Sequence, residues 1–249
     1  MITGKAIVKT YGNKEEKNNA LNKVSITIED GEFVAVMGPS GCGKSTLLFG
    51  LSGTDEIDGG SVRFNDKELS KMKDNQLSDL RRRKMGFVFQ QPTMLKNLNL
   101  LDNIILPAAQ EHRKDMGRIT VRAKELMRQT GIEELAARDI TEVSGGQLQR
   151  AGICRALINS PEILFADEPT GALNSKAADE IMELFAEINQ KGTAIMLVTH
   201  DAKVAAKAKR VLFMKDGEIV HELAISEYAD RPMKEKVELV SLQMHKMEI

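Results

Sequence analysis

The chain has 249 residues, of which 42% are hydrophobic and 29% charged, with a formal net charge of −1. This composition is typical of a globular protein with one large domain or a core plus a subdomain, and its balanced charge excludes a general attraction to nucleic acid or anionic lipid. Two cysteines suit a reducing compartment, and no apolar run approaches the roughly 18 residues of a membrane span, so we expect a cytoplasmic protein.

The first part of the chain alternates short β-like runs with turns. Apolar patterning predicts strands at 5–9, 24–29, 33–37, 61–65 and 86–89, and a helix at 44–51. The four consecutive basic residues at 81–84 are interpreted as a solvated helix face.

The middle of the chain, residues 91–160, reads as mostly helical. Helices are expected at 103–106, 120–130 and 146–159, where apolar residues recur at helical spacing. Asp102 is expected to cap the first of these helices and Pro107 to end it.

After residue 160 the β/α alternation resumes. It predicts strands at 163–166 and 194–199, a helix at 175–190, and a hairpin of 211–215 with 218–222. The sequence therefore predicts an α/β fold, whose parallel-sheet core comprises 1–90 and 161–223 and is interrupted by a helical subdomain at 91–160.

The segment 224–249 contains a heptad-like apolar seam. Its members are spaced 4, 3, 4 and 3 residues apart, Leu239 and Leu242 widen the stripe, and Pro232 suits a helix start. The seam itself comprises Met233, Val237, Val240, Met244 and Met247. We expect an amphipathic helix at 233–247, packed either on its own α/β core or on a second chain or membrane partner.

A glycine-rich loop follows the strand expected at 33–37 and opens the helix expected at 44–51. It reads Gly38-Pro39-Ser40-Gly41-Cys42-Gly43-Lys44-Ser45-Thr46 and fits the phosphate-loop pattern G-x-x-x-x-G-K-[ST]. Glycines let backbone N–H groups converge on phosphate oxygens, at a helix N-terminus that favours anions. Lys44 would neutralise the β- and γ-phosphates and Ser45 would ligate Mg²⁺.

Two further motifs carry chemistry. Asp167 and Glu168 end an apolar strand, where neighbouring residues point to opposite sides, so one suits a Mg²⁺ shell and the other the polarisation of a water. The run Ser144-Gly145-Gly146-Gln147 is a second anion-binding helix start, which makes sense beside the first if it serves the nucleotide of another chain. Alone, this run would be a simple helix cap.

Three single residues complete the set. His200 follows a strand and suits the γ-phosphate, Gln90 follows another strand and suits Mg²⁺ or the attacking water, and Tyr11 suits stacking on adenine. Without the other motifs, each of them is better explained as a packing residue.

Together these six motifs resemble the ABC ATPase family and occur in its order over about residues 2–223. The resemblance implies a P-loop NTPase (RecA-like) parallel-sheet core with an antiparallel β subdomain, and a helical subdomain carrying the Ser144 motif. It also implies a homodimer with ATP at the interface, each ATP held by the phosphate loop of one chain and by Ser144 and Gly146 of the other. The resemblance further implies an integral membrane permease as a partner, and a peripheral position on the inner face of the cell membrane.

The resemblance assigns a role to each motif residue. The catalytic residues are Glu168, His200 and Gln90, and the Mg²⁺ ligands are Ser45, Gln90 and Asp167. The ATP-binding residues are Tyr11, Gly38, Ser40, Gly41, Cys42, Gly43, Lys44, Ser45, Thr46, Ser144, Gly145, Gly146 and Gln147.

Two positions depart from the commonest family pattern. Val143 stands where Leu is usual, and Asn174 stands where Asp is usual, which puts the strength of coupling between the two ATP sites in doubt. A narrower resemblance, carried by residues 86–90, 103–107 and 166–175, is to the macrolide-exporter, lipoprotein-release and antimicrobial-peptide-resistance group.

The leading hypothesis is the ATPase subunit of a bacterial transporter for peptides, antibiotics or lipoproteins. A regulatory ABC ATPase of the cell-division type, which transmits force without transport, stays open as the alternative. A DNA-repair ABC ATPase would need long heptad runs between the two glycine loops, and a P-loop kinase would lack the Ser144 motif. We therefore expect no nucleic-acid partner.

Overall fold

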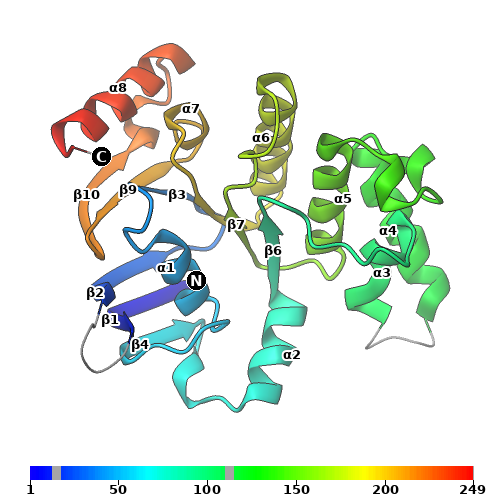
Figure 1. Cartoon of the computed structure of the whole chain (residues 1–249), viewed down its shortest axis with the longest axis horizontal. Helices are drawn as coiled ribbons and strands as arrows, with labels where there is room; N and C mark the ends of the chain where they lie inside the picture. Colours follow the sequence, from blue (N-terminus) through cyan, green and yellow to red (C-terminus); the bar gives the residue numbers. More distant parts are fainter. Residues whose placement is uncertain (13–17, 110–114, 249) are drawn as a thin grey trace.

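The computed structural model describes residues 1–12, 18–109 and 115–248. Two sheets organise the chain: a six-stranded sheet in the order β10-β9-β3-β8-β7-β6 and a four-stranded sheet in the order β2-β1-β4-β5 (Figure 1). Within the described ranges, no helix is both long and apolar enough to cross a membrane.

The larger sheet is parallel except at one edge. Its five parallel strands are almost wholly buried, which explains why they read as continuous apolar runs in the sequence. The sixth strand, β10, forms an antiparallel hairpin with β9. The strands are β3 (Phe33–Met37), β6 (Met85–Phe89), β7 (Ile163–Asp167), β8 (Ala194–Val198), β9 (Arg210–Lys215) and β10 (Glu218–Ala224).

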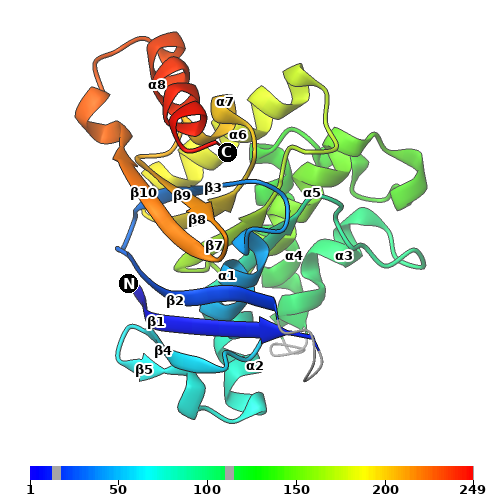
Figure 2. The ribbon, with the colours of Figure 1, turned by 60° about the vertical axis from the view of Figure 1, so that its left-hand side comes forward.

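The smaller sheet is antiparallel and lies beneath the first (Figure 2). Its strands are longer than the sequence pattern predicts, because register shifts interrupt the alternation of buried and exposed residues in β1. They are β1 (Ile2–Tyr11), β2 (Asn18–Ile28), β4 (Gly59–Phe64) and β5 (Lys67–Glu68).

Helices cover both faces of the larger sheet. The helix α1 (Lys44–Leu51) packs between the two sheets, in one apolar cluster with residues from β1, β3 and β8. On the opposite face lie α6 (Ser175–Gln190) and the short α7 (Ala202–Ala205), in a second cluster (Figure 2). The α/β fold predicted from the sequence is confirmed.

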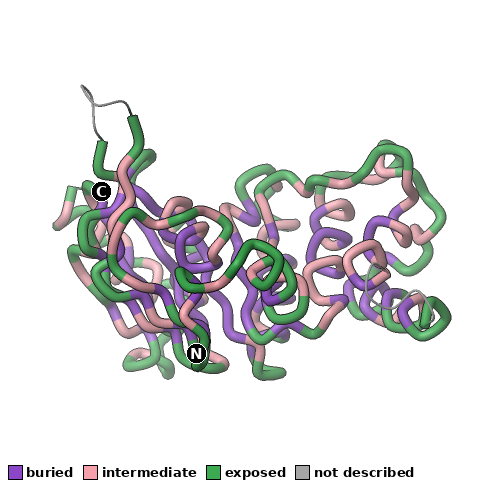
Figure 3. The backbone as a smooth tube through the Cα atoms, turned by 90° about the horizontal axis from the view of Figure 1, so that it is seen from below, coloured by how far each residue is buried: buried purple, intermediate pink, exposed green. Residues whose placement is uncertain are grey.

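A third apolar cluster forms a separate helical lobe beside β6, and the burial colouring shows its own buried interior (Figure 3). The lobe consists of α3 (Leu100–Ala109), α4 (Met116–Gln129) and α5 (Gly145–Leu157), with one-turn 3₁₀ helices η3 (Glu133–Leu135) and η4 (Ile140–Glu142).

Two expectations about α3 are wrong. Pro107 lies inside the helix and does not end it, and Asp102 lies in its first turn, where its N–H donates to the Asn99 side chain at 2.8 Å. The cap is therefore Asn99. Burial of Ile104 and Ala108 against α4 and α5 overrides the helix-breaking tendency of proline in the last turn.

The basic run at 81–84 ends α2 (Asp74–Lys84), which follows the 3₁₀ turn η1 (Leu69–Lys71). It is not wholly a solvated face. The guanidinium of Arg81 donates to the Gly53 carbonyl, and that of Arg82 lies 2.6 Å from an Asp79 carboxylate oxygen.

The last helix, α8 (Met233–Lys246), follows the turn η5 (Ile225–Tyr228) and packs on the chain's own core. Val240 is fully buried there, whereas Leu242 is 49% exposed. The end of α8 is tied to the end of β9, because the Lys215 ammonium donates to the Met247 carbonyl oxygen at 2.9 Å.

Candidate functional site

The glycine-rich loop between β3 and α1 has the backbone that a phosphate loop requires. Gly43 has φ 103°, in the left-handed region, and a Cβ there would lie 2.2 Å from the Ala20 carbonyl oxygen. Only glycine fits this position. Ser40 and Gly41 are exposed at the tip, while Ser45 and Thr46 are half-buried in the first turn of α1.

Lys44 lies within this loop. Its side chain is buried, and its ammonium donates to the carbonyl oxygens of Gly38 and Pro39, both at 2.8 Å. A positive charge thus lies beside the N-terminus of α1, where both features favour an anion.

Cys42 is buried in the same loop, and burial raises the pKa of its thiol although the nearby Lys44 charge opposes this. The buried thiol fills space in the loop. The carbonyl of Cys42 accepts a hydrogen bond from the N–H of Gly217 at 3.1 Å, which ties the loop to the β9–β10 turn.

The structure brings the first acid of the 167–168 pair to this loop. The Ser45 hydroxyl donates to Asp167 Oδ1 at 3.0 Å, although the two residues are 122 positions apart. Burial raises the pKa of Asp167, the Ser45 hydrogen bond opposes this, and the neighbouring Glu168 charge raises the pKa further. A half-buried carboxylate beside a hydroxyl has the chemistry of a hard-cation ligand pair.

Glu168 contacts the predicted histidine. Its Oε1 lies 2.9 Å from His200 Nδ1, and the two side chains are 20% and 72% exposed, respectively. The backbone of Glu168 has φ 49°, and its N–H donates to the Val198 carbonyl at 3.0 Å. A non-glycine residue in this region costs conformational energy, which is common at functional sites.

Gln90 is exposed just past the end of β6, beside the turn that follows Glu168. In that turn the N–H of Gly171 donates to the Glu168 carbonyl at 3.0 Å. A Cβ on Gly171 would lie 2.9 Å from Gln90 Nε2, so the amide rests directly against the turn. The ends of β6 and β7 thus bring Gln90 and Glu168 to one place.

Tyr11 lies at the end of β1 with its ring 45% exposed. Its hydroxyl donates to Asp55 Oδ2 at 2.6 Å, and the Lys9 ammonium lies 2.9 Å from Asp55 Oδ1 and 5.2 Å from the ring centroid. Burial and the Asp55 hydrogen bond raise the pKa of Tyr11. Burial also opposes ionisation of Asp55, but hydrogen bonds from Tyr11 and Lys9 prevail and lower its pKa.

The Ser144 motif starts α5 in the helical lobe. Ser144 Oγ accepts from the Gln147 N–H at 3.3 Å, and Gln147 Oε1 accepts from the Ser144 N–H at 2.8 Å, which is a complete capping box. The motif faces the start of α6, where a Cβ on Gly146 would lie 3.5 Å from the Ala177 Cβ. Figure 1 shows β6 and α6 between α5 and α1, so the two glycine loops are in different lobes.

Asn174, one of the two departures from the family pattern, caps α6. Its side-chain oxygen accepts a hydrogen bond from the Ala177 N–H at 2.9 Å. An amide serves this cap as an aspartate would, because both offer an acceptor oxygen at the N-cap.

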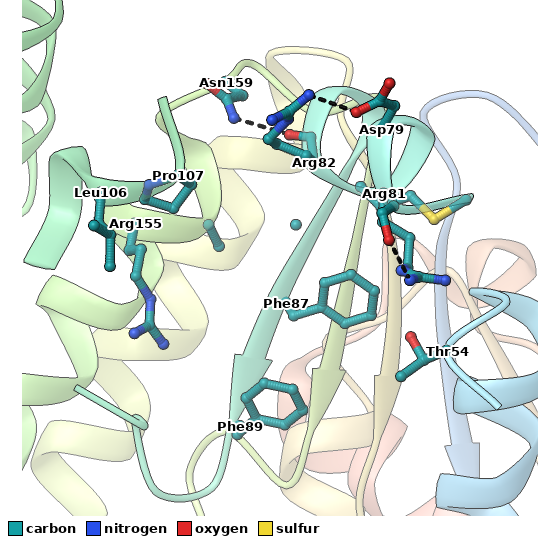
Figure 4. Close-up of a pocket in the computed structure, with 14 residues that line it drawn as sticks. Thr54, Asp79, Arg81, Arg82, Phe87, Phe89, Leu106, Pro107, Arg155 and Asn159 are labelled. Atoms are coloured by element: carbon teal, nitrogen blue, oxygen red, sulfur yellow. Dashed lines mark hydrogen bonds and ion pairs between the residues drawn. The ribbon is translucent and has the colours of Figure 1, made fainter. Parts of the chain in front are cut away.

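A groove of about 540 Å³ opens between the two lobes (Figure 4). Phe87 and Phe89 line its middle, Arg81 and Thr54 lie on one side, and Leu106, Pro107 and Arg155 lie on the other. Sequence reasoning missed this groove because its walls come from α2, β6, α3 and α5, which are far apart along the chain.

A profile of the ABC transporter family matches residues 21–171, well over half of the chain. The chain is 40% identical to the macrolide export ATP-binding/permease protein MacB of Aggregatibacter actinomycetemcomitans, in a match covering 89% of this chain and 34% of that protein. It thus spans about a third of such relatives. The bacitracin export ATP-binding protein BceA of Halalkalibacterium halodurans is also 40% identical, over 87% of this chain and 86% of BceA.

Solved structures agree in fold. The cassette MJ0796 of Methanocaldococcus jannaschii, in a dimeric post-hydrolysis state bound to ADP and Pi, matches with a TM-score of 0.84 at 39% identity, over 90% of this chain and 99% of that one. The cbiO1 protein of Clostridium perfringens matches with a TM-score of 0.82 at 27% identity, over 100% and 98%. The chain therefore belongs to the ABC transporter family, as an ATP-hydrolysing cassette with a P-loop NTPase fold.

Proposed function

We propose that this chain is the ATP-hydrolysing subunit that energises a membrane permease for peptides, antibiotics or lipoproteins. The proposal rests on two side-chain contacts beside the phosphate loop: the Ser45 hydroxyl donates to Asp167, and Glu168 contacts His200. The acids and the histidine lie at the ends of the adjacent strands β7 and β8. Export relatives of the MacB and BceA types support the substrate class.

Each side chain has a separate task in this mechanism. Lys44 and the loop N–H groups bind the phosphates and oppose their charge. Glu168 accepts a proton from the attacking water, and His200 holds the Glu168 carboxylate through the 2.9 Å contact. Gln90, resting on the turn after Glu168, orients the water, and Tyr11 offers its exposed ring to adenine.

Mg²⁺ fits the donor set of Ser45, Asp167 and Gln90, whose ligand atoms are all oxygens. Over residues 1–12, 18–109 and 115–248, no three or more His, Cys, Asp or Glu side chains cluster in a way that could hold a metal. Mg²⁺ suits such a partial site, because it usually takes one or two protein oxygens and completes its shell with phosphates and water. When bound, it would neutralise phosphate charge.

The Ser144 motif is proposed to bind the ATP held by a second copy of the chain. It lies in the other lobe from the phosphate loop, and its N-cap Ser144 is exposed and so accessible to an anion from outside its own chain. The dimeric state of the MJ0796 cassette, which is bound to ADP and Pi, supports a homodimer. The separation of the two glycine loops within one chain favours a head-to-tail arrangement with ATP at the interface.

The groove between the lobes is proposed as the seat of an acidic, amphipathic segment of the permease. Its phenylalanines would pack on the apolar side of that segment, and the arginines of α2 and α5 would meet its acidic side. MacB relatives, which carry ATP-binding and permease functions in one protein, support a permease partner and a position at the inner face of the membrane.

Pairing and nucleotide binding are separable by mutation. We expect Ser144→Arg to abolish ATP-dependent dimers while ATP affinity of the monomer changes less than about twofold. Lys44→Ala should weaken that affinity about tenfold or more, because it removes a charge-assisted contact of roughly 1.5–3 kcal/mol. Nucleotide titration and size-exclusion chromatography with ATP measure the two effects.

Two controls complete this experiment. Ser70→Arg adds the same charge and bulk at an exposed position away from both loops and should pair normally. Ser144→Ala removes the cap and one hydroxyl contact to the partner's nucleotide without adding bulk, so it should weaken pairing less than Ser144→Arg does. If Ser144→Arg weakened monomer ATP binding as much as Lys44→Ala, the role of Ser144 at the partner's nucleotide would be wrong.

The groove is tested by Leu106→Lys. A charge on its apolar wall should lower the membrane-bound share of the protein in the source cells about tenfold, while ATP hydrolysis by the purified chain stays unchanged. Val121→Lys, at a 70% exposed position on α4 outside the groove, is the matched control and should stay membrane-bound. Equal membrane binding by both variants would contradict the docking site. Loss of binding without loss of transport would favour the regulatory alternative.

A further inference from the structure

Gln149 is a buried amide whose two ends differ in their contacts. It lies in α5, is 1% exposed, and its Nε2 donates to the carbonyl oxygens of Phe89 at 3.0 Å and of Pro169 at 2.7 Å. Since both partners can only accept, the orientation of the amide is fixed. Its Oε1 is buried without a hydrogen-bond partner among the described residues. The amide therefore links those two carbonyls and belongs to no wider network.

The two carbonyls belong to the two loops of the proposed catalytic site. Phe89 directly precedes Gln90, and Pro169 directly follows Glu168. The strands before these loops pair in register, and Phe89 opposite Asp167 is the last pair of their ladder. Gln149 thus joins the loops at the point where the sheet no longer holds them together.

The same helix contacts the Gln90 loop again, further along. A Cβ on Gly152 would lie 3.3 Å from the Pro92 Cβ, and Arg155 Nη1 donates to the Thr93 carbonyl at 2.5 Å. Arg155 also lines the groove. The helix α5 therefore runs from its cap at Ser144 past Gln149 to Arg155 in the groove. Gln149 is the residue through which this helix binds both catalytic loops.

We propose that Gln149 is a positioning residue for ATP hydrolysis, which sets the separation between Gln90 and Glu168 according to the seating of α5. The proposal rests on the roles proposed above for Gln90 and Glu168. A misplacement of about 1 Å at a reacting centre lowers rates as much as 10²-fold. If α5 shifts when Ser144 binds the partner's nucleotide, or when the groove binds the permease, the shift would change the rate of hydrolysis through the Gln149 amide.

The test compares Gln149→Met with Gln149→Lys. Methionine has similar length and volume but no donor, whereas lysine restores N–H donors on a long side chain. We expect Gln149→Met to lower kcat about 10- to 100-fold while the Kd for ATP changes less than about twofold, and Gln149→Lys to recover most of the rate. If Gln149→Met does not fold, Gln149→Asn replaces it, because its amide is one methylene too short to reach both carbonyls.

Asn189→Leu is the matched control. Asn189 is also a buried amide, 6% exposed, and its Nδ2 donates to the carbonyls of Gly31 and Thr193, both at 3.0 Å and outside the two catalytic loops. Its thermal stability should fall about as far as that of Gln149→Met, with kcat near the wild-type value. An equal loss of kcat would mean general loosening of the protein and would overturn the proposal.

Glu168→Gln, measured in parallel, separates this inference from the function it rests on. Wild-type kcat in Gln149→Met together with an inactive Glu168→Gln would overturn the role of Gln149 alone. Wild-type kcat in Glu168→Gln would overturn the proposed roles in the catalytic site itself.

Discussion

Replacement of Glu168 by Gln is expected to lower the rate of ATP hydrolysis by about 10²–10⁴-fold, the usual contribution of a general base. The amide has the same shape as the carboxylate and the same tolerance for the φ of 49° at this position, but it cannot accept a proton from water. ATP affinity should stay within about twofold, because we propose that the phosphates bind the loop at 38–46 and not this side chain. Single-turnover hydrolysis and nucleotide titration measure the two quantities.

ATP that stays bound should then favour the dimer, visible as a larger species on size-exclusion chromatography. Glu162→Gln provides the control, since Glu162 is a partly exposed glutamate at the start of β7 that pairs with Lys84 at 2.7 Å. It should hydrolyse ATP normally. Hydrolysis at the wild-type rate by Glu168→Gln would remove Glu168 from the mechanism and leave the water without an identified base.

Val240→Asp is expected to destabilise the chain by about 3 kcal/mol or more, since it places an unpaired carboxylate in an apolar core. Val240 is fully buried against the cluster that includes α6 and β9. For a domain of this size, the loss corresponds to a fall of roughly 6–12 °C in Tm. Because α8 is the last helix of the described chain, it can leave the core without unfolding the rest. The free-energy cost of this release is the largest destabilisation that Val240→Asp can cause.

Leu242→Asp is the control, on the same helix but 49% exposed, and its Tm should stay within about 2 °C of the wild type. Limited proteolysis distinguishes release of α8 from global unfolding, because a released helix is cut while the remaining domain survives. If both variants melted like the wild type, α8 would contribute no stability to the chain alone, and its seam would have to serve a partner instead.

The sequence was sufficient for most of the sheet architecture. Strands β3, β7 and β8 are buried on both faces, so their apolar runs are continuous and bounded by turns. Only the basic end of α2, residues 81–84, was interpreted as helical, because the helix is mostly polar and Leu80 is its one buried residue. The prediction that Pro107 ends its helix was wrong, because the low helix propensity of proline is overcome by the packing of Ile104 and Ala108.

Residues within a contiguous motif could be predicted, and residues that act only through tertiary contacts could not. Lys44 and Ser45 stand in a pattern whose spacing is fixed by the chain itself. Asp55 meets Tyr11 across 44 positions, and Gln149 meets Phe89 across 60, with no local pattern to mark either pair. Single carboxylates and amides are common on any helix or turn, so only the fold distinguishes these two.

The hydrogen bond from the Lys215 ammonium to the end of α8 has a mechanical consequence. From the Met247 carbonyl the connection runs through the Lys215 ammonium to the β9–β10 turn, and from the Gly217 N–H to the Cys42 carbonyl in the nucleotide loop. Tension applied near residue 247 is thus transmitted by a few hydrogen bonds to the floor of the loop. We therefore expect a fluorophore attached near residue 247 to respond to nucleotide binding, although this end of the chain lies outside the nucleotide loop.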